Sequence, residues 1–289
     1  MRVKRIFLLT LIVTLAMLVF NLSYDKDIDH RVRSASAAPK TSAEQTSKPS
    51  AQHIPTVFIH GWKGSERSFR TMFERLHANY DGPARAMVVT VDPNGVVKLT
   101  GEITDQKIPL IQVLFVRNHE SMEQQAAWLI NVFRILKRDY GISRVNVVSH
   151  SMGGKAFTCY LEKIKIPAEY PTIKKYVAIA APFDWINGPQ NDNDYTISKL
   201  KQESYLYQHR QRLPKNMDVL ALAGEIREPH EGDGVVSLQS AYFGKYFFSP
   251  AHYTEKIVYG PSAQHSMLHE NPQVDRIIAS YLWQIKPKK

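Results

Sequence analysis

The chain has 289 residues, of which 44% are apolar and 22% are charged, and its formal net charge is +10. This composition is typical of a globular protein and excludes a disordered or collagen-like chain. The positive charge is spread along the sequence with no run of basic and aromatic residues, so we expect no nucleic-acid partner, whereas attraction to a membrane or to anionic cell-wall polymer is compatible with it.

Residues 1–37 have the pattern of an export signal. Three basic residues precede an apolar run over residues 6–20, which as a helix would span about 22 Å, less than a hydrocarbon core of roughly 30 Å. A short run after a basic start favours a signal peptide, and the small residues 35–37 predict cleavage before Ala38. The polar stretch over residues 21–34 is longer than the usual spacer, so an uncleaved membrane anchor is the alternative. Both interpretations predict an exported protein, secreted or held at the outer face of the cytoplasmic membrane.

A flexible linker and one folded domain are predicted after this segment. Residues 38–54 are rich in small and polar residues without apolar periodicity, and the domain is expected over residues 55–289. Apolar runs predict strands over residues 56–59, 86–91, 96–99, 109–116, 145–148, 176–180, 219–223 and 256–259. Helical periodicity and cap residues predict helices over residues 68–79, between 121 and 141, over 153–164 and from 271 onward.

This order of elements predicts an α/β fold with a mainly parallel central sheet and helices on both faces. The Asn-Gly pair at residues 94–95 predicts a hairpin turn between two of the strands. Residues 184–214 are polar and irregular, and we expect them to form a cap or lid insertion. Cys159 is the only cysteine, so the fold must hold without an intrachain disulfide.

A serine stands between the strand predicted over residues 145–148 and the helix that follows it. In the sequence Ser-His-Ser151-Met-Gly-Gly, small residues lie two before and two after Ser151, where a sharp strand-to-helix turn brings the backbone close to neighbouring strands. Such a turn projects the hydroxyl into a site, so Ser151 is the predicted nucleophile. Ser149 stands where the motif G-x-S-x-G has its first glycine, a departure that adds only a hydroxymethyl group. The alternative is that Ser151 merely caps the helix.

Two backbone N–H groups form the predicted oxyanion hole. The first belongs to Met152, which follows the nucleophile at the start of a helix, where the helix dipole is positive. The second belongs to Trp62, which follows His60-Gly61 at the end of the first core strand and lies on a loop that can reach the same oxygen.

The catalytic acid is expected after the strand over residues 219–223, because the chain order in this arrangement is serine, acid, histidine. Asp233 lies there on a loop flanked by glycines, which can turn its carboxylate toward a histidine. Glu225, Glu228 and Glu231 lie nearby in a charge-rich stretch that is typical of a solvated loop. Asp233 is therefore the predicted acid.

The catalytic base is expected after the last strand. His265 lies in the loop between that strand and the last helix, and it is the predicted base. His269 is the rival, but it lies closer to the helix cap at Asn271 and can serve a structural hydrogen bond there. We expect His60, His119 and His150 to be packing or loop residues, although His150 directly precedes the nucleophile and could line the site.

Together these segments resemble the α/β-hydrolase superfamily and, more closely, the cell-surface hydrolases of Gram-positive bacteria, a family without an assigned function. The resemblance covers roughly residues 55–285 and implies the α/β-hydrolase fold, an esterase- or lipase-like activity, Ser151 as nucleophile, Asp233 as acid and His265 as base. It rests on His60-Gly61 with Ser68-Phe69, the hairpin over 92–101, and residues 109–115, 149–154, 233–236 and 265–272.

The predicted reaction is hydrolysis of a small-molecule or lipid carboxyl ester through an acyl-enzyme, without a metal or organic cofactor. Asp192-Asn-Asp194 is not expected to bind calcium, because Ile197 stands where a calcium loop requires glycine. An acyltransferase with the same residues, or a surface module that only binds, are the alternatives. An aromatic segment over residues 242–253 is expected to pack on the sheet; an acyl-binding or lipid-facing wall is the alternative. The oligomeric state is not predicted.

Overall fold

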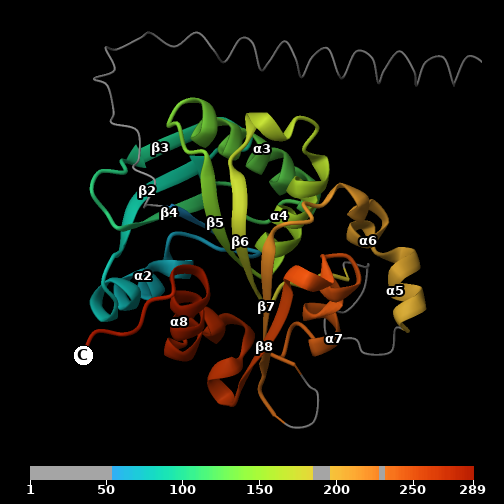
Figure 1. The fold of residues 1–289 in the computed structure, drawn as a ribbon. Helices are drawn as coiled ribbons and strands as arrows, with labels where there is room; N and C mark the ends of the chain where they lie inside the picture. The colour runs from blue at the N-terminus through green and yellow to red at the C-terminus, as the bar shows by residue number, and fades with distance from the viewer. Residues whose placement is uncertain (1–53, 185–195, 228–231) are drawn as a thin grey trace, which may run out of the picture. The chain divides into compact units, whose positions relative to one another are not determined.

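A computed structural model describes residues 54–184, 196–227 and 232–289 of the protein (Figure 1). The predicted export signal, nearly all of the predicted linker, Glu228, Glu231 and residues 192–194 lie outside the described residues. Within the three described stretches, no helix combines the length and the apolar character needed to cross a bilayer.

An eight-stranded sheet runs through the described part of the chain, in the order β3-β2-β4-β1-β5-β6-β7-β8. Its strands are β1 (Thr56–Ile59), β2 (Pro83–Val91), β3 (Val97–Gly101), β4 (Ile108–Phe115), β5 (Arg144–His150), β6 (Thr172–Ile179), β7 (Asp218–Glu225) and β8 (Tyr253–Tyr259). β3 is antiparallel to β2, whereas all other neighbouring strands are parallel. The predicted hairpin and the mainly parallel sheet are therefore confirmed.

Each face of the sheet has its own buried apolar cluster. In β1, Val57 and Ile59 belong to one cluster, whereas Phe58 between them belongs to the other. Val147 and Val148 of β5 divide between the faces in the same way. Successive side chains of a strand point to opposite faces, so a strand covered on both faces needs a continuous apolar run. The sequence of β1 contains such a run.

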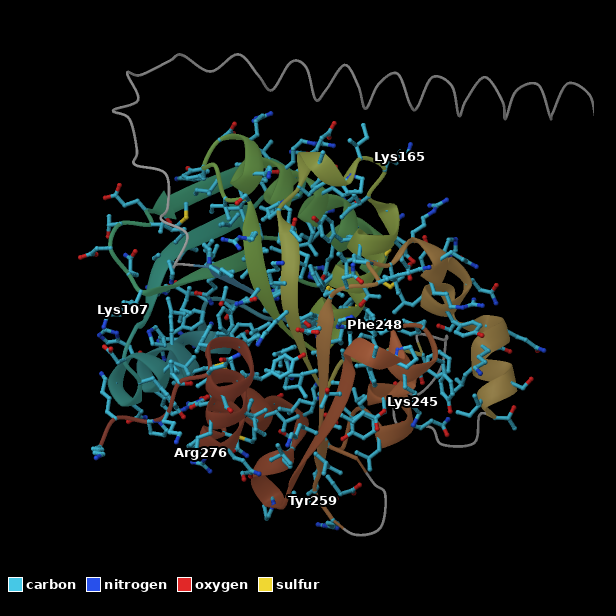
Figure 2. The ribbon with its side chains drawn as sticks, viewed as in Figure 1. Lys107, Lys165, Lys245, Phe248, Tyr259 and Arg276 are labelled. Atoms are coloured by element: carbon cyan, nitrogen blue, oxygen red, sulfur yellow. The ribbon has the colours of Figure 1, made fainter. Side chains whose placement is uncertain are left out.

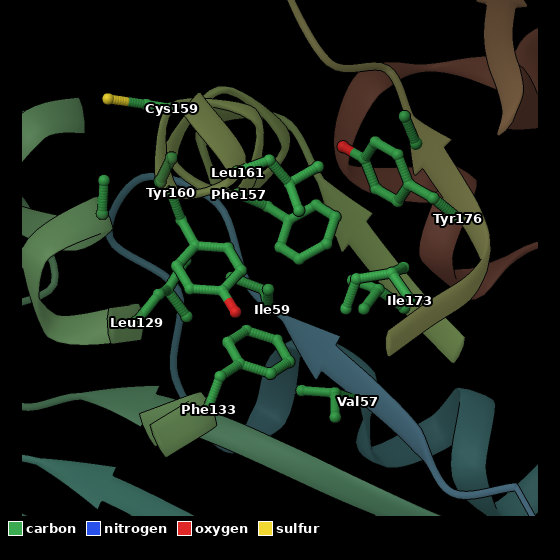
Figure 3. Close-up of a cluster of buried hydrophobic side chains, with 14 of the residues drawn as sticks. Val57, Ile59, Leu129, Phe133, Phe157, Cys159, Tyr160, Leu161, Ile173 and Tyr176 are labelled. Atoms are coloured by element: carbon green, nitrogen blue, oxygen red, sulfur yellow. The ribbon is translucent and has the colours of Figure 1, made fainter. Parts of the chain in front are cut away.

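Helices cover both faces (Figure 1). α3 (Met122–Arg138) and α4 (Met152–Lys163) supply the first cluster, in which Phe133, Phe157 and Tyr160 pack together near Val57 and Ile59 (Figure 3). α2 (Arg67–Asn79) and α8 (Pro272–Ile278) supply the second cluster on the other face. Short helical segments elsewhere include η1 (Pro167–Glu169), η5 (Pro261–Ala263), η6 (His265–Glu270) and the π-helix η7 (Ala279–Trp283).

The predicted helix starts also agree with the structure. The side chain of Ser121 accepts a hydrogen bond from the backbone N–H of Gln124 and caps α3. Asn271 accepts from the N–H of Gln273 and caps α8, whose first residue is Pro272. Each side chain satisfies a backbone N–H that has no partner within its helix, which is why these residue types begin helices.

Two segments between the last strands pack onto the first cluster. α5 (Ile197–Glu203), α6 (Tyr205–His209) and η2 (Arg210–Arg212) form the described part of the predicted insertion, and Leu200 and Leu206 are fully buried there. Its role as a lid stays a prediction. α7 (Leu238–Ala241), η3 (Phe243–Tyr246) and η4 (Pro250–His252) span the aromatic segment, whose Phe243, Phe247 and Phe248 are also buried.

The packing interpretation of the aromatic segment is thus confirmed, and the idea that it forms a lipid-facing patch is wrong for its three phenylalanines. Figure 2 shows Phe248 among the packed side chains, whereas Lys107 and Lys165 lie at the periphery. The single cysteine, Cys159, is buried in the same cluster, as expected of a small apolar residue.

Candidate active site

Ser151 occupies a sharp turn between β5 and α4. β5 ends at His150 and α4 begins at Met152, so Ser151 is the single residue between them, with φ of 54° and ψ of −127°. A positive φ is unfavourable for a residue with a side chain, and it persists where the surrounding structure enforces it. Here the N–H of Ser151 donates to the carbonyl oxygen of Ile179 at 2.9 Å.

The glycine two residues after the serine is required by a close approach of backbone. A Cβ atom at Gly153 would lie 2.5 Å from the carbonyl oxygen of His60 and 2.7 Å from that of Ile59. No side chain fits at these distances, so the turn demands glycine at this position. The small-residue pattern around Ser151 therefore has the steric cause that the sequence predicted.

Ser149, which replaces the first glycine of the motif, is accommodated by a buried partner. Its Oγ lies 2.9 Å from the hydroxyl of Tyr176, and that hydroxyl also donates to the carbonyl oxygen of Gly154 at 3.3 Å. Ser149 and Tyr176 are both fully buried, and burial raises the pKa of Tyr176 well above its ordinary value. The tyrosine therefore stays neutral, and the hydroxymethyl group gains a hydrogen bond without opening the turn.

The structure brings Ser151, His265 and Asp233 into one hydrogen-bonded chain. Oγ of Ser151 lies 2.9 Å from Nε2 of His265, and Nδ1 of His265 lies 2.7 Å from Oδ2 of Asp233. With its proton on Nδ1, the imidazole donates to the carboxylate and leaves Nε2 free to accept the serine proton. The three residues come from the ends of β5, β7 and β8, which meet at one edge of a parallel sheet.

The carboxylate of Asp233 is fixed from both sides. Its Oδ1 accepts the backbone N–H groups of Val235 at 2.9 Å and Val236 at 2.7 Å, and its side chain is buried. The loop also joins the histidine through its backbone, because the N–H of His265 donates to the carbonyl oxygen of Asp233 at 2.9 Å. The acid and the base are thus held as one unit.

His269 and Glu225, the alternatives for the base and the acid, have other hydrogen-bond partners. His269 forms a hydrogen bond through Nδ1 with Glu270 at 3.2 Å, and burial lowers its pKa. Glu225 ends β7 and accepts the N–H of Gly232 at 3.2 Å, so it supports the loop that carries Asp233. Neither side chain forms a hydrogen bond with Ser151 or His265 among those found within the described residues.

Two further histidines lie at the ends of strands near the site, His60 directly after β1 and His150 as the last residue of β5. His60 is buried, donates from Nδ1 to the carbonyl oxygen of Gly61 at 2.8 Å and accepts the N–H of Phe115 on Nε2 at 3.1 Å, so it is a packing residue as predicted. His150 donates from Nε2 to the carbonyl oxygen of His265 at 3.0 Å, and its ring lies 4.6 Å from that of His265. Burial, and after it the charges of His265, His269 and His60, lower the pKa of His150 well below its ordinary value. This contact with the base was not predicted; its signal in the sequence is the position directly before the nucleophile.

The two residues predicted to form the oxyanion hole are both close to Ser151, Met152 as the next residue in the chain and Trp62 as the residue after Gly61. Met152 is the first residue of α4, and the loop that carries Trp62 lies against the serine, since a Cβ at Gly61 would be 2.8 Å from Cβ of Ser151. The N–H of Lys63 donates to the carbonyl oxygen of Asn118 at 2.9 Å and holds this loop in place. Among the described residues, no acceptor is paired with the N–H of Trp62 or of Met152.

Comparison with known proteins gives a family and two solved relatives. Residues 43–285 match the family described as "Alpha/beta hydrolase of unknown function (DUF915)". The crystal structure of the lin2722 gene product from Listeria innocua has a TM-score of 0.70 and 31% identity, over 81% of this chain and 95% of that chain. A "putative cell surface hydrolase" from Lactobacillus plantarum WCFS1 has a TM-score of 0.65 and 25% identity, over 82% of this chain and 94% of that chain. No curated protein matches the chain. The predicted fold and family resemblance are confirmed.

Proposed function

The chain belongs to the alpha/beta hydrolase family of unknown function that its residues 43–285 match, and within that family we propose that it is a serine hydrolase of carboxyl esters. The observation that carries the proposal is the chain of hydrogen bonds from Ser151 through His265 to Asp233, at 2.9 and 2.7 Å. A serine with a positive φ at a strand-to-helix turn, a histidine within reach and a buried carboxylate behind it have the geometry of an activated nucleophile.

The first step forms an acyl-enzyme. His265 accepts the proton of Ser151 on Nε2 while Oγ attacks the ester carbonyl, and the negative charge on the carbonyl oxygen is stabilised by the N–H groups of Met152 and Trp62. Asp233 keeps the imidazole in the correct tautomer and stabilises the imidazolium. The imidazolium then donates its proton to the leaving alkoxide, so the alcohol departs and the acyl group stays on Ser151.

The second step releases the acid. His265 removes a proton from water, the hydroxide attacks the acyl carbonyl through the same oxyanion geometry, and Ser151 regains its proton as the carboxylic acid leaves. Side chains, backbone N–H groups and water perform both proposed steps. An acyltransferase would differ only in this step, because an acceptor alcohol would replace water.

A series of p-nitrophenyl esters of increasing acyl length, with and without an added alcohol acceptor, tests this proposal. We expect release of p-nitrophenol with formation of the free acid, and a dependence of kcat/KM on acyl length. Formation of the new ester in place of the acid would show an acyltransferase. No release with any ester of the series would refute ester hydrolysis and favour an amide or thioester substrate or the surface module that binds without catalysis.

We also propose that the protein acts outside the cytoplasm. This proposal is supported by the basic and apolar pattern of residues 1–37 and by the cell-surface description of the Lactobacillus relative. Its substrate would then be an ester found at the cell surface or in the medium.

A further inference from the structure

Four large apolar side chains are exposed around the candidate active site. Trp62, Val116, Val235 and Met267, which we call the apolar collar, have 51%, 59%, 41% and 45% of their surface exposed. Within the described residues, eight large apolar side chains are more than a third exposed, and the other four, Val96, Tyr140, Ile166 and Tyr259, lie on separate segments. Single exposed apolar residues are common on protein surfaces, but a group around one site is not.

Each member of the collar is linked to the site through its own backbone or through one or a few neighbouring residues. Trp62 follows Gly61, which lies against Ser151, and Val116 follows Phe115, whose N–H donates to His60 at 3.1 Å. Val235 donates its backbone N–H to Asp233 at 2.9 Å, and Met267 lies two residues after the histidine. These links place the four exposed side chains on segments that carry or adjoin the site.

The two loops on the Trp62 side form one surface. Asn118 Nδ2 donates to the carbonyl oxygen of Gly64 at 2.8 Å, and the ring of Trp62 lies 6.2 Å from that of His119. Exposed tryptophan side chains are favourable at the boundary between water and lipid, since the ring is apolar and its N–H is polar. A small water-soluble ester would leave the apolar collar exposed to water, whereas an acyl chain or a lipid surface would cover it.

The positive charge of the protein favours a lipid surface with anionic headgroups. The net charge is +10, and two exposed cations, Lys63 and Arg117, directly follow Trp62 and Val116; Arg117 also forms an ion pair with Glu120 at 3.1 Å. Cations next to apolar side chains favour membranes with anionic headgroups, because the charges bind the headgroups while the apolar groups enter the interface.

We propose that the apolar collar docks on an anionic lipid bilayer and that the ester cleaved at Ser151 is an acyl ester of a lipid in that bilayer. This inference rests on the proposed ester hydrolysis and adds its substrate class. Docking places the acyl carbonyl of a lipid at the mouth of the site, so that the lipid moves from the bilayer to Ser151 without crossing water.

The test uses the chain that begins at Ala38, so that residues 6–20 do not bind membranes themselves. The Listeria and Lactobacillus structures support folding of this part alone, since matches to 81% and 82% of this chain cover 95% and 94% of those chains. The collar variant is Val116→Ser with Met267→Ser, which leaves Trp62 and its N–H in place. Val96→Ser with Ile166→Ser is the matched control, because these side chains are equally exposed, at 57% and 55%, but lie elsewhere.

Three quantities are measured: sedimentation with phosphatidylglycerol and with phosphatidylcholine vesicles, release of fatty acid from phosphatidylglycerol, and hydrolysis of p-nitrophenyl butyrate in solution. We expect the parent and the control to bind phosphatidylglycerol vesicles and release fatty acid. The collar variant should do both at least about tenfold less while it hydrolyses the soluble ester as the parent does. The single variants separate the two side chains if the double variant loses the soluble activity through misfolding.

Other outcomes overturn the inference in distinguishable ways. Equal vesicle binding by the parent, the collar variant and the control would refute docking through the apolar collar. Equal binding to phosphatidylglycerol and phosphatidylcholine vesicles would refute the role of charge. Vesicle binding without release of fatty acid would refute the lipid ester as substrate. In each of these cases hydrolysis of the soluble ester still supports the proposed function, whereas its absence in the parent would refute that function itself.

Discussion

His150 donates from Nε2 to the backbone carbonyl oxygen of His265 at 3.0 Å. Its neighbour in the chain, Ser151, lies 2.9 Å from Nε2 of the same histidine. Two adjacent residues of the turn thus hold the base at two points, its backbone and its ring. Since α4 and β5 fix the turn, the distance between nucleophile and base depends on His150 as well as on the Asp233 loop.

We predict that His150→Leu lowers kcat by about tenfold, which corresponds to about 1.4 kcal/mol of activation barrier, because the backbone of the base is no longer held in line with Ser151. His150→Gln should retain most of the activity, because its amide nitrogen can donate to the same carbonyl oxygen. KM should stay within about twofold, since the change affects alignment and not ester binding. Steady-state kinetics with the soluble ester measures both. If both variants lose thermal stability but keep kcat, the residue has only a structural role.

His265→Ala and His269→Ala should behave differently. The first removes the proposed base and should lower kcat by about 10³-fold or more. The second removes a hydrogen bond to Glu270, made at 3.2 Å, and should cost about 1 kcal/mol of stability while activity is retained. Activity and thermal unfolding of the two purified variants decide this. A folded but inactive His269→Ala beside an active His265→Ala would reverse the assignment of the base.

Glu162 of α4 makes the stability of the fold depend on pH. Its side chain is buried, and neither carboxyl oxygen has a hydrogen-bond partner within the described residues. Burial raises the pKa of Glu162 from 4.5 to about 8, and the nearby charges of Lys163 and Arg212 only partly oppose this. Because the folded-state pKa lies above the unfolded value, the stability is fully present below about pH 4.5 and is lost as the pH rises toward 8.

We therefore predict that Glu162→Gln raises the Tm at pH 8 and leaves it nearly unchanged at pH 4.5. Each 1 kcal/mol gained corresponds to about 2–4 °C for a domain of this size. Lys155, whose pKa burial lowers to about 7, titrates in both proteins, so the difference between their pH profiles isolates Glu162. Thermal unfolding at a series of pH values measures it. A constant difference at all pH values would show that Glu162 does not titrate in this range.

The predicted export signal determines where the mature protein should begin. If residues 35–37 are a cleavage site, the protein made in its own host begins at Ala38. Intact-mass measurement of the exported protein reads this directly. A mass that retains residues 1–37 would refute the secreted form and favour the uncleaved anchor, while the outward location would be unaffected.

The fold could be predicted from local patterns because its central strands are covered on both faces. Such strands are continuous apolar runs, and the strand predicted over residues 56–59 coincides with β1. The chain order of Ser151, Asp233 and His265 likewise follows from where parallel strands end, so these three side chains could be placed at one edge before their distances were known.

Contacts between distant segments could not be predicted in this way. The bond between His150 and His265 joins residues 115 positions apart, and nothing in the local pattern distinguishes it from packing. Glu162 lies near the end of α4, and a charged residue in a helix is normally expected to face solvent. In the structure it is buried, and α6 and η2 pack against α4. The apolar collar is also visible only in the structure, because its four residues come from four separate segments, three loops and η6.

Labelling by a fluorophosphonate probe tests the central claim most directly, because the probe reacts with a serine that a neighbouring base has activated. The parent chain and Ser151→Ala are compared at equal concentration, after thermal unfolding has shown that both are folded, and the modified residue is identified by peptide mass spectrometry. We predict rapid labelling of the parent at Ser151 and a rate at least about 10³-fold lower for the variant. Labelling of Ser151→Ala at the rate of the parent, or a modified residue other than Ser151, would contradict the account.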